Sequence, residues 1–434
     1  MLDIRLIKEN PEDIIKRMAD KGKDVRAEVE EILKLDGERR ALILETDNLK
    51  AEQNKVSKEI PKMKKAGEDT APVLARMKEL SDKIKENDVK VREVDAAFRN
   101  VMLALPNLPD PDLLPGEKEN NQTIRVHGEP HVFDFEPKHH VDLCTDLGLI
   151  DYERGTKLSG SGFWIYRGMG ARLEWALLNY FMETHLNDGY EMVMVPHMLG
   201  GETGTVSGQF PKFRDEVYWL ESEEGEARSH FMLPTAETAL VSLHMNEILT
   251  EKELPRKYFA YTPCFRKEAG SHRADERGMV RGHQFNKVEM FQYTLPEKSD
   301  EAFEELVKKA EALVAGLGFH FRTVKLAAGD CSASMARTYD IEIHIPSMNG
   351  YKEVSSVSNA RDYQARRGAI RFRREATGKT EFVHTLNGSG LATSRILPAI
   401  VEQNQLKDGS VVVPEVLRKY MGGIEVLTKD MKNW

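Results

Sequence analysis

The sequence has few cysteines and no long apolar run, and each absence excludes a class of protein. Its three cysteines, Cys144, Cys264 and Cys331, lie far apart and form no CxxC pair, so neither a disulfide framework nor a cysteine zinc site is expected. No stretch approaches the roughly 20 apolar residues that a membrane span needs, and the N-terminus MLDIRLIKENPED is charged where a signal peptide would be apolar. We therefore expect a soluble, cytoplasmic protein.

Aromatic residues are also absent from the start of the chain, since all 33 lie from Phe98 onward. The 434 residues suffice for roughly two to three domains, and a hydrophobic content of 40% with a net charge of −9 excludes a disordered chain. We predict an N-terminal domain over residues 1–104, a proline-rich linker over 105–120 and a second domain over 121–434.

Residues 26–100 combine interleaved charges with an apolar repeat of seven residues. Lys and Arg number 17 there, as do Asp and Glu. The repeat runs through Leu35, Leu42, Leu49, Val56 and Met63, and after a break over 66–72 it resumes at Met77, Ile84, Val91 and Phe98. Because the break is short, the pattern predicts an antiparallel coiled-coil arm over about residues 27–100, with helices roughly 55 Å long.

Basic residues outnumber acidic ones near the turn of this hairpin. The cations are Lys55, Lys58, Lys62, Lys64, Lys65 and Arg76, and the nearby acids are Glu59, Glu68 and Asp69. One interpretation is a solvated helix face. The other is a surface that contacts phosphate far from the main body.

Beyond the linker, the sequence predicts an α+β domain. Strands are expected over 191–198, 230–234, 257–268, 282–295, 319–325, 339–345, 351–356 and 380–386, and helices over 171–186, 238–249, 301–317 and 391–404. Several strands follow one another without an intervening helix. This order favours an antiparallel sheet flanked by helices over a doubly wound parallel sheet.

The densest cluster of functional residue types is CFRKEAGSHRADERGMVRGHQFNKVEMF, residues 264–291, which is typical of a strand, a polar loop and a second strand. Alternation places Arg266 and Glu268 on one face of the first strand, and Phe285, Lys287 and Glu289, with Arg281 and His283, on one face of the second. A solvent-facing hairpin would also alternate charges. An aromatic ring between arginines and carboxylates nevertheless suits a nucleotide, because arginines pair with phosphate and the ring offers a flat face to the base.

These motifs resemble those of the class II aminoacyl-tRNA synthetases. FRKE, a loop and RGHQF are similar to motif 2, and the continuation HQFNKVEMF resembles the seryl-tRNA synthetase family more closely. LPTAETAL at 233–240 resembles that family's serine-binding signature, YKEVSSVSN at 351–359 its segment for ATP and metal, and HTLNGSGLATSRILPAIVEQNQ at 384–405 its motif 3. Residues 170–198 resemble motif 1, which implies a homodimer through the segment that ends at Pro196.

The resemblance implies ATP-dependent activation of L-serine and transfer of the seryl group to tRNA(Ser), and to tRNA(Sec) where it is present. It implies a class II antiparallel sheet, and an arm that grips the long variable arm of tRNA(Ser). Serine already carries a nucleophilic carboxylate, so no catalytic Ser, Cys or His is required, and positioning and charge neutralisation carry the rate.

The resemblance also implies roles for single residues. ATP is expected to contact Arg266, Lys267, Glu268, Arg281, Phe285, Glu353, Val354, Ser355, Ser356 and Arg395. Catalysis is expected of Arg266 at the α-phosphate, Glu268 at the adenosine end and Arg395 at the γ-phosphate. Serine is expected to contact Thr235, Ala236, Glu237, Arg266, Glu289, Asn387 and Ser389. Mg²⁺ is expected on Glu353 and Ser356, and no zinc is expected.

Three other functions remain open. His272, Ala274 and Glu276 in the motif 2 loop, Val357 and Ala360, and the stretch GDCSASMARTYDIE at 329–342 depart from the family pattern, which allows a specialised paralogue resistant to a serine-mimicking inhibitor. An amino acid:carrier-protein ligase would lack the full arm. A catalytically silent RNA-binding homologue would show eroded site residues, whereas Arg266, Glu268, Glu353 and Arg395 are intact.

The histidines of HVFDFEPKHH form a last candidate. His131, His139 and His140 could hold a metal, but ordinary polar surface at the entrance of the second domain is the favoured interpretation.

Overall fold

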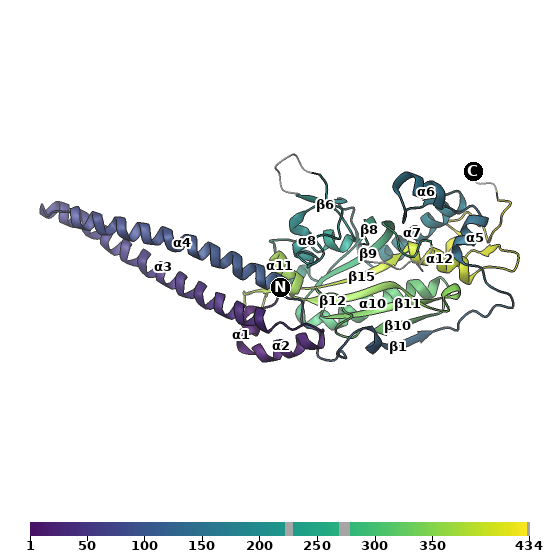
Figure 1. The fold of residues 1–434 in the computed structure, drawn as a ribbon, viewed down its shortest axis with the longest axis horizontal. Coiled ribbons are helices and arrows are strands. Elements are labelled where there is room, and N and C mark those ends of the chain that lie inside the picture. The colour runs from purple at the N-terminus through teal and green to yellow at the C-terminus, as the bar shows by residue number, and fades with distance from the viewer. Residues whose placement is uncertain (222–228, 269–277, 432–434) are drawn as a thin grey trace. The chain divides into compact units, whose positions relative to one another are not determined.

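The computed structural model describes residues 1–221, 229–268 and 278–431. Within it the chain forms two compact units (Figure 1). One comprises residues 2–19 and 23–105, and the other comprises Met1, residues 20–22 and residues 106–434. Among the described residues, no helix has both the length and the apolar character that a membrane crossing demands.

The first unit is an antiparallel coiled-coil arm on a small helical base. Its helices are α1 (Ile4–Glu9), α2 (Pro11–Asp20), α3 (Arg26–Ala66) and α4 (Ala71–Ala104). Gly67 ends α3 with φ +74°, a left-handed conformation that glycine adopts without a steric penalty. The 41 residues of α3 span about 60 Å at 1.5 Å per residue, so the predicted arm is confirmed.

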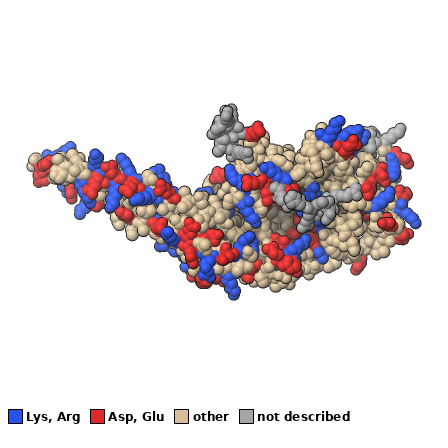
Figure 2. Space-filling model, viewed as in Figure 1, with Lys and Arg blue, Asp and Glu red and all other residues tan. Residues whose placement is uncertain are grey.

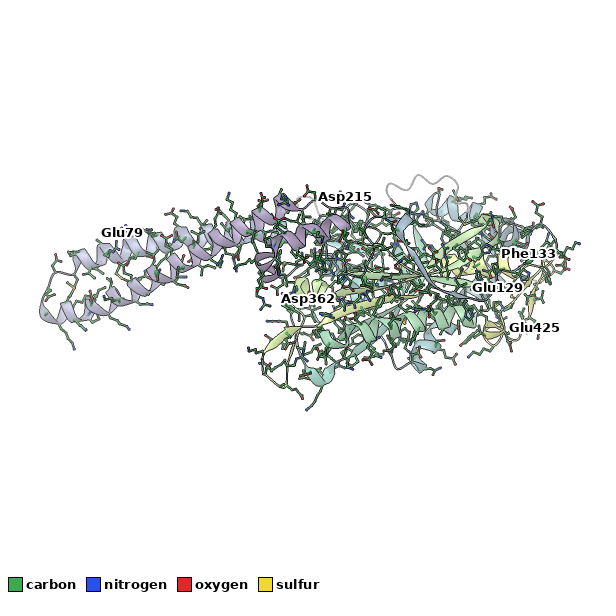
Figure 3. The ribbon with its side chains drawn as sticks, turned by 90° about the horizontal axis from the view of Figure 1, so that it is seen from below. Glu79, Glu129, Phe133, Asp215, Asp362 and Glu425 are labelled. Carbon is green, nitrogen blue, oxygen red and sulfur yellow. The ribbon has the colours of Figure 1, made fainter. Side chains whose placement is uncertain are left out.

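Apolar residues on the inner faces of α3 and α4 hold the arm together. Leu80 is 1% exposed, and Leu35 and Ile84 are also buried. Ion pairs cross between the helices, with Lys50 Nζ 3.5 Å from Asp88 Oδ1 and Arg76 Nη2 2.8 Å from Glu52 Oε1. Figure 2 shows Lys and Arg interspersed with Asp and Glu along the arm, and in Figure 3 side chains project outward around both helices.

The second unit is built on an eight-stranded sheet with the order β1-β10-β11-β12-β15-β9-β8-β4. The strands are β1 (Gln122–His127), β4 (Glu191–Met192), β8 (Arg256–Phe265), β9 (Gln284–Thr294), β10 (Phe321–Lys325), β11 (Arg337–Ile345), β12 (Gly350–Arg361) and β15 (His384–Ala392). Every neighbouring pair is antiparallel except β4 and β8, which are parallel. The expected antiparallel sheet flanked by helices is thus confirmed, with one parallel edge.

Smaller elements surround this sheet. The helices are α5 (His140–Asp146), α6 (Tyr152–Ser159), α7 (Met169–Asn187), α8 (Gly201–Ser207), α9 (Ala236–Leu240), α10 (Ser299–Gly316), α11 (Tyr363–Gly368), α12 (Thr393–Gln403) and α13 (Glu415–Arg418). The short strands are β2 (Ile150–Asp151), β3 (Ile165–Tyr166), β5 (Met198–Gly200), β6 (His230–Met232), β7 (Ile248–Thr250), β13 (Arg371–Arg373), β14 (Thr380–Phe382), β16 (Val411–Val412) and β17 (Val426–Leu427).

The two faces of the sheet belong to different apolar cores. Val288 and Met290 on β9 pack in a core with residues of α7, α10 and α12. Phe291 and Tyr293 on the same strand belong to a second core with residues of α8, α9 and α11. Because side chains alternate along a strand, Lys287 and Glu289 lie on the face of the second core, which also carries the candidate site.

Two secondary-structure predictions are wrong, and a third is correct only in part: the strand expected over 380–386 is divided between β14 in a three-stranded sheet and β15 in the eight-stranded sheet. The helix expected over 238–249 ends at Leu240, and residues 248–250 form β7, which pairs in parallel with β13 more than 120 residues later. The strand expected over 191–198 is regular only at Glu191–Met192, and Met198 begins the separate strand β5. Contacts distant in sequence decide both segments, so local patterns could not predict them.

Candidate active site

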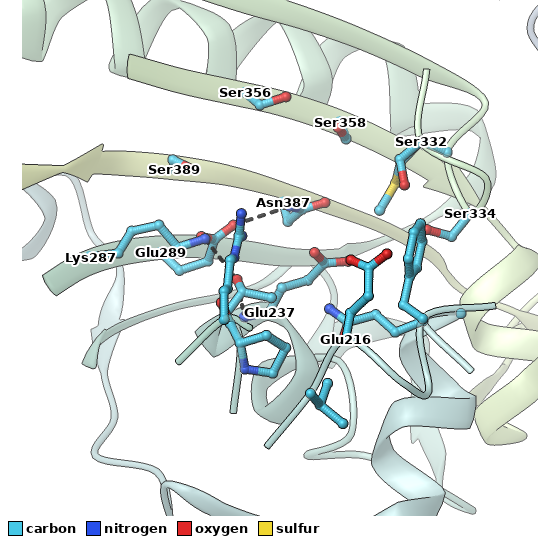
Figure 4. Close-up of a pocket in the computed structure, with 18 of the residues that line it drawn as sticks. Glu216, Glu237, Lys287, Glu289, Ser332, Ser334, Ser356, Ser358, Asn387 and Ser389 are labelled. Carbon is cyan, nitrogen blue, oxygen red and sulfur yellow. Dashed lines mark hydrogen bonds and ion pairs between the residues drawn. The ribbon is translucent and has the colours of Figure 1, made fainter. Parts of the chain in front are cut away.

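Residues of β9 and residues that follow the end of β8 line a cavity of about 650 Å³. Side chains from β9, β12 and β15 line one side, and residues from α9 and from segments 208–217 and 332–335 line the other (Figure 4). A smaller compartment of about 80 Å³ adjoins it, lined by Phe285, Val354 and Arg395 among others. Six residues line both compartments: Arg266, Glu268, Arg281, Lys287, Glu353 and Ser389.

The paired strands set the motif 2 residues beside each other. Cys264 pairs with Phe285 in register, and the Arg266 amide donates to the His283 carbonyl at 2.9 Å just beyond the strands. The Arg266 guanidinium then lies 5.4 Å from the centre of the Phe285 ring, with its Nε donating to the Pro234 carbonyl at 3.1 Å. A ring and an arginine so placed can hold a flat base and an anion together.

A second arginine, Arg281, lines both compartments of the site. Its Nη1 donates to Glu268 Oε2 at 2.9 Å. Glu268 has φ +50°, which is uncommon outside glycine and is held here by the surrounding structure. The rest of the motif 2 loop, including His272, Ala274 and Glu276, lies outside the described residues.

Arg395 reaches the same junction from α12. A bulge between Ser389 and Ala392, with Leu391 at φ +81°, redirects the chain from β15 into α12. Arg395 Nη1 donates to the Glu353 carbonyl at 2.8 Å and lies 3.0 Å from Glu353 Oε2. Burial would raise the pKa of Glu353, but the charge and hydrogen bond of Arg395, together with the charges of Arg266 and Lys287, outweigh burial and hold the pKa below its usual value.

Ser356 and Asp340 face each other across β12 and β11. The Ser356 hydroxyl donates to Asp340 Oδ1 at 2.7 Å. Burial and the neighbouring Glu353 carboxylate raise the pKa of Asp340 well above its usual value. Glu353, Ser356 and Asp340 thus form a group of oxygen donors, which is the ligand chemistry that Mg²⁺ prefers.

The deeper part of the large cavity carries two carboxylates. Glu237 accepts a hydrogen bond from Gln364 Nε2 at 2.8 Å, and Glu289 accepts one from Asn387 Nδ2 at 3.1 Å. Burial and the nearby Glu289 charge raise the pKa of Glu237 to about 7. Lys287 Nζ makes an ion pair with Glu289 Oε2 and donates to Thr235 Oγ1 at 2.7 Å.

Three residues that the sequence placed in the site point elsewhere. Lys267 Nζ donates to the Asp215 carbonyl at 3.5 Å, the Ser355 hydroxyl donates to the Ser389 carbonyl at 2.6 Å, and Ala236 is buried within α9. None of these side chains lines either compartment of the described structure. Ser355 alternates with Ser356 along β12, so its side chain faces the opposite core.

Sequence patterns missed several residues of the cavity. Gln209, Glu216, Ser332, Ser334 and Ser358 line it. Gln209 and Glu216 belong to a segment without a motif, whereas Ser332, Ser334 and Ser358 lie in stretches named above, where no role was expected for these serines. Alternation along the strand places Lys287 on the face that lines the cavity, but the motif indicates no role for it. Lys287 lies two residues from both Phe285 and Glu289, and this spacing indicates that the three side chains share one face of the strand.

Two of the histidines considered as metal ligands lie beside Glu402. The candidate ligand atoms of His139, His140 and Glu402 lie within 4.8 Å of one another. Glu402 already accepts hydrogen bonds from the amide and the ring of His140 and from the amide and hydroxyl of Ser347. Because four hydrogen bonds already satisfy this carboxylate, its role is structural: it holds α12 against the segments that contain His140 and Ser347.

The sheet order, with arginines and carboxylates at the ends of its central strands, defines a class II aminoacyl-tRNA synthetase core. Residues 218–404 match the family described as tRNA synthetase class II core domain (G, H, P, S and T), and residues 1–109 match the seryl-tRNA synthetase N-terminal domain. Serine–tRNA ligase 2 of Clostridium acetobutylicum is 61% identical over 97% of this chain and 99% of its own. Serine–tRNA ligase of Nitratidesulfovibrio vulgaris is 47% identical over 99% of this chain and 100% of its own.

A solved structure agrees over the whole chain. The seryl-tRNA synthetase of Pyrococcus horikoshii complexed with ATP has a TM-score of 0.91 at 37% identity and covers 99% of both chains. The chain belongs to the seryl-tRNA synthetase family.

Proposed function

We propose that this protein activates L-serine with ATP and transfers the seryl group to tRNA(Ser), and to tRNA(Sec) where that tRNA is present. The observation that carries the proposal is the junction of the two compartments. Arg266 and Arg281 line both compartments, and Glu237 and Glu289 line the larger one beside them. An amino-acid carboxylate and an α-phosphate can therefore meet between fixed positive charges. The names of the relatives and the ATP in the Pyrococcus horikoshii structure support the same reaction.

Activation joins a carboxylate oxygen of serine to the α-phosphorus of ATP, and the bond to the bridging oxygen breaks as pyrophosphate leaves. The 3′-terminal ribose hydroxyl of the tRNA then attacks the carbonyl carbon of the adenylate, and AMP leaves. Arg266 neutralises charge at the α-phosphate, Arg281 and Arg395 bind the outer phosphates, and Phe285 stacks on the adenine. Such fixed charges act without reorganisation during the reaction.

Further ATP contacts are proposed along the same wall. Glu268 binds the adenosine end, and Val354 packs beside it in the small compartment. Lys267 and Ser355, whose side chains point away, act at most through their backbone groups.

Serine is proposed to lie in the acidic end of the cavity. Glu289 accepts a hydrogen bond from the serine hydroxyl, and Thr235 and Glu237 bind the serine ammonium. Asn387 and Ser389 form the rest of the subsite wall, and Ala236 contributes to its shape through the backbone of α9. A site built around a hydroxyl leaves a buried carboxylate unpaired when alanine enters, so it rejects alanine strongly. Threonine is excluded by shape, because the subsite has too little space for its additional methyl group.

Mg²⁺ is proposed to bind Glu353 and Ser356. Both side chains, with Asp340 behind Ser356, offer only oxygen, which fits a hard cation. When bound, Mg²⁺ would neutralise phosphate charge. The chain's own contribution is to orient the Ser356 hydroxyl through Asp340 and the Glu353 carboxylate through Arg395.

A homodimer is proposed through the segment that ends at Pro196. Met194 is 91% exposed, and Trp175 on α7, Met192 on β4 and Met198 on β5 are exposed as well. Large apolar side chains grouped on neighbouring elements are typical of an interface.

The arm is proposed to bind tRNA(Ser) as part of an N-terminal domain over 1–104, joined by residues 105–120 to a catalytic domain over 121–434. Lys55, Lys58, Lys62, Lys64 and Lys65 are exposed near its turn. None of these lysines has a carboxylate within 4 Å among the described residues, so they remain open to phosphate. The proposed location is the cytoplasm.

One experiment tests the whole function. ATP–pyrophosphate exchange is measured with each of the twenty amino acids singly, and total tRNA is then charged with the amino acid that supports exchange. We expect exchange with serine alone and charging of tRNA(Ser). Exchange with another amino acid, or transfer to a carrier protein instead of tRNA, would overturn the proposal.

A second candidate is a specialised second copy of the enzyme. The Clostridium acetobutylicum relative at 61% identity is named Serine–tRNA ligase 2, whereas several relatives at 44–47% carry no number. A serine-mimicking adenylate analogue distinguishes the two, because an inhibitor-resistant copy retains exchange activity at concentrations that stop a housekeeping enzyme.

A further inference from the structure

Lys287 occupies the middle of the strand that carries the proposed adenine and serine contacts. It lies two residues from Phe285 and two from Glu289 on β9, so all three side chains share one face. The side chain is 7% exposed and lines both compartments. A lysine is seldom buried to this degree unless it is paired.

The ammonium of Lys287 connects two residues of the proposed serine subsite. It donates to Thr235 Oγ1 at 2.7 Å and pairs with Glu289 Oε2 (Figure 4). Glu289 Oε1 is held separately by Asn387 Nδ2 at 3.1 Å. Among the described residues, Glu289 Oε2 receives no hydrogen bond of acceptable geometry despite the ion pair. It therefore retains a lone pair for a further donor such as a hydroxyl.

The charge balance of the cavity also depends on this lysine. Glu237 and Glu289 lie close enough for the Glu289 charge to raise the pKa of Glu237, and Lys287 and Arg266 both lower it. Two carboxylates enclosed together are costly unless cations compensate them. Arg266 is the other cation that acts on Glu237, and it remains when Lys287 is removed.

We propose that Lys287 is the positioning residue of the serine subsite: its ammonium fixes Thr235 and Glu289 in the orientation that receives serine and balances the charge of the two acids. This inference rests on the proposed function, since it names how the same site recognises its amino acid. Lys287 acts through Thr235 and Glu289. Its loss should therefore weaken the binding of serine, whereas loss of a simple phosphate contact would weaken the binding of ATP.

The test compares Lys287→Met, which keeps the length and removes the charge, with Lys287→Arg, which keeps the charge. Lys257→Met is the matched control, because Lys257 lies on the neighbouring strand β8 and pairs with Glu305 instead of a cavity residue. In ATP–pyrophosphate exchange we expect Lys287→Met to raise the serine KM about 100-fold, while the ATP KM changes less than about threefold. Lys287→Arg should recover part of the loss, and Lys257→Met should behave as wild type.

A pH profile separates positioning from a structural role. Glu237 faces Lys287 and Glu289 from β9, Arg266 from the end of β8 and the neutral Gln364 from α11. Since Lys287 lowers the pKa of Glu237 from the value that burial alone would give, its loss raises that pKa. The acidic limb of kcat/KM for serine should then move to higher pH by about one unit in Lys287→Met and stay in place in Lys257→Met.

Each outcome decides the assignment. An unchanged serine KM in Lys287→Met, an equal rise of the ATP KM, or an unshifted pH limb would overturn the role of Lys287, provided that wild type shows serine-dependent exchange. If wild type itself lacks serine-dependent exchange, the proposed function fails first and this inference with it.

Discussion

Arg395 Nη1 lies 3.0 Å from Glu353 Oε2 and donates to the carbonyl of the same residue at 2.8 Å. The arginine proposed for the γ-phosphate and the carboxylate proposed for Mg²⁺ are thus paired before substrate binds. Glu353 holds the arginine in place through two contacts, one from its backbone and one from its side chain. The arrangement is preorganised, so little reorientation is needed when a phosphate enters.

Replacement of Arg395 by alanine should lower kcat/KM for ATP by about 100- to 1000-fold, since a charge fixed at the developing pyrophosphate is lost. ATP–pyrophosphate exchange at saturating serine measures this loss. The control is Arg322→Ala, which breaks a similar pair between Arg322 Nε and Glu342 Oε2 at 2.7 Å on β10 and β11. Equal activity in the two variants would contradict the role of Arg395.

Replacement of Glu289 by alanine should raise the serine KM about 100-fold with little change for ATP, because the acceptor for the serine hydroxyl is lost. Replacement by glutamine, which keeps a neutral acceptor, should have a smaller effect in the same direction. The preference for serine over alanine should fall in the same variants. Exchange assays with both amino acids measure this ratio. An unchanged serine KM and turnover would remove Glu289 from the site.

Replacement of Lys55, Lys58, Lys62, Lys64 and Lys65 by glutamine should reduce kcat/KM for tRNA about 10- to 100-fold at low salt, with a weaker dependence of binding on salt. Serine-dependent exchange should remain normal, because the described residues that line the serine and ATP compartments all belong to the second unit. The control replaces arm lysines that already have carboxylate partners, namely Lys34, Lys50, Lys83 and Lys90. Normal charging by the five-lysine variant would assign the tip no role in tRNA binding.

The stability of the protein should depend on pH through Glu237. Its pKa in the folded protein is about 7, above the usual value of 4.5, so its contribution to stability is complete below about pH 4.5 and is lost as the pH rises through 7. Glutamine cannot ionise. We therefore expect Glu237→Gln to be more stable than wild type by about 1–3 kcal/mol at pH 8 and nearly equal to it at pH 4.5.

Chemical denaturation without substrates at both pH values measures this difference. A larger gain at pH 4.5 than at pH 8 would have the opposite sign and would contradict the raised pKa. Serine activation should be impaired in the same variant, since the proposed ammonium contact loses its charge.

Sequence patterns predicted those parts of the fold that depend on local periodicity. The heptads anticipated α3 and α4, and alternation anticipated β8, β9 and the shared face of Phe285, Lys287 and Glu289. The helix expected over 238–249 failed because β7 pairs with β13, a contact that no local pattern contains. Ser355 and Lys267 were assigned by motif, and only the strand register and the adjacent loop showed that their side chains turn away.

By itself, the sequence determined the charged arm, the strand, loop and strand of motif 2, and the residue types that bind phosphate and amino acid. Tertiary structure alone decided that Arg395 from α12 reaches Glu353 on β12 and that Lys287 spans Thr235 and Glu289. The direction of a side chain follows from local backbone geometry, which the sequence pattern predicts. Its partner and its protonation depend on distant strands that pack around it and exclude water, and local sequence does not contain that information.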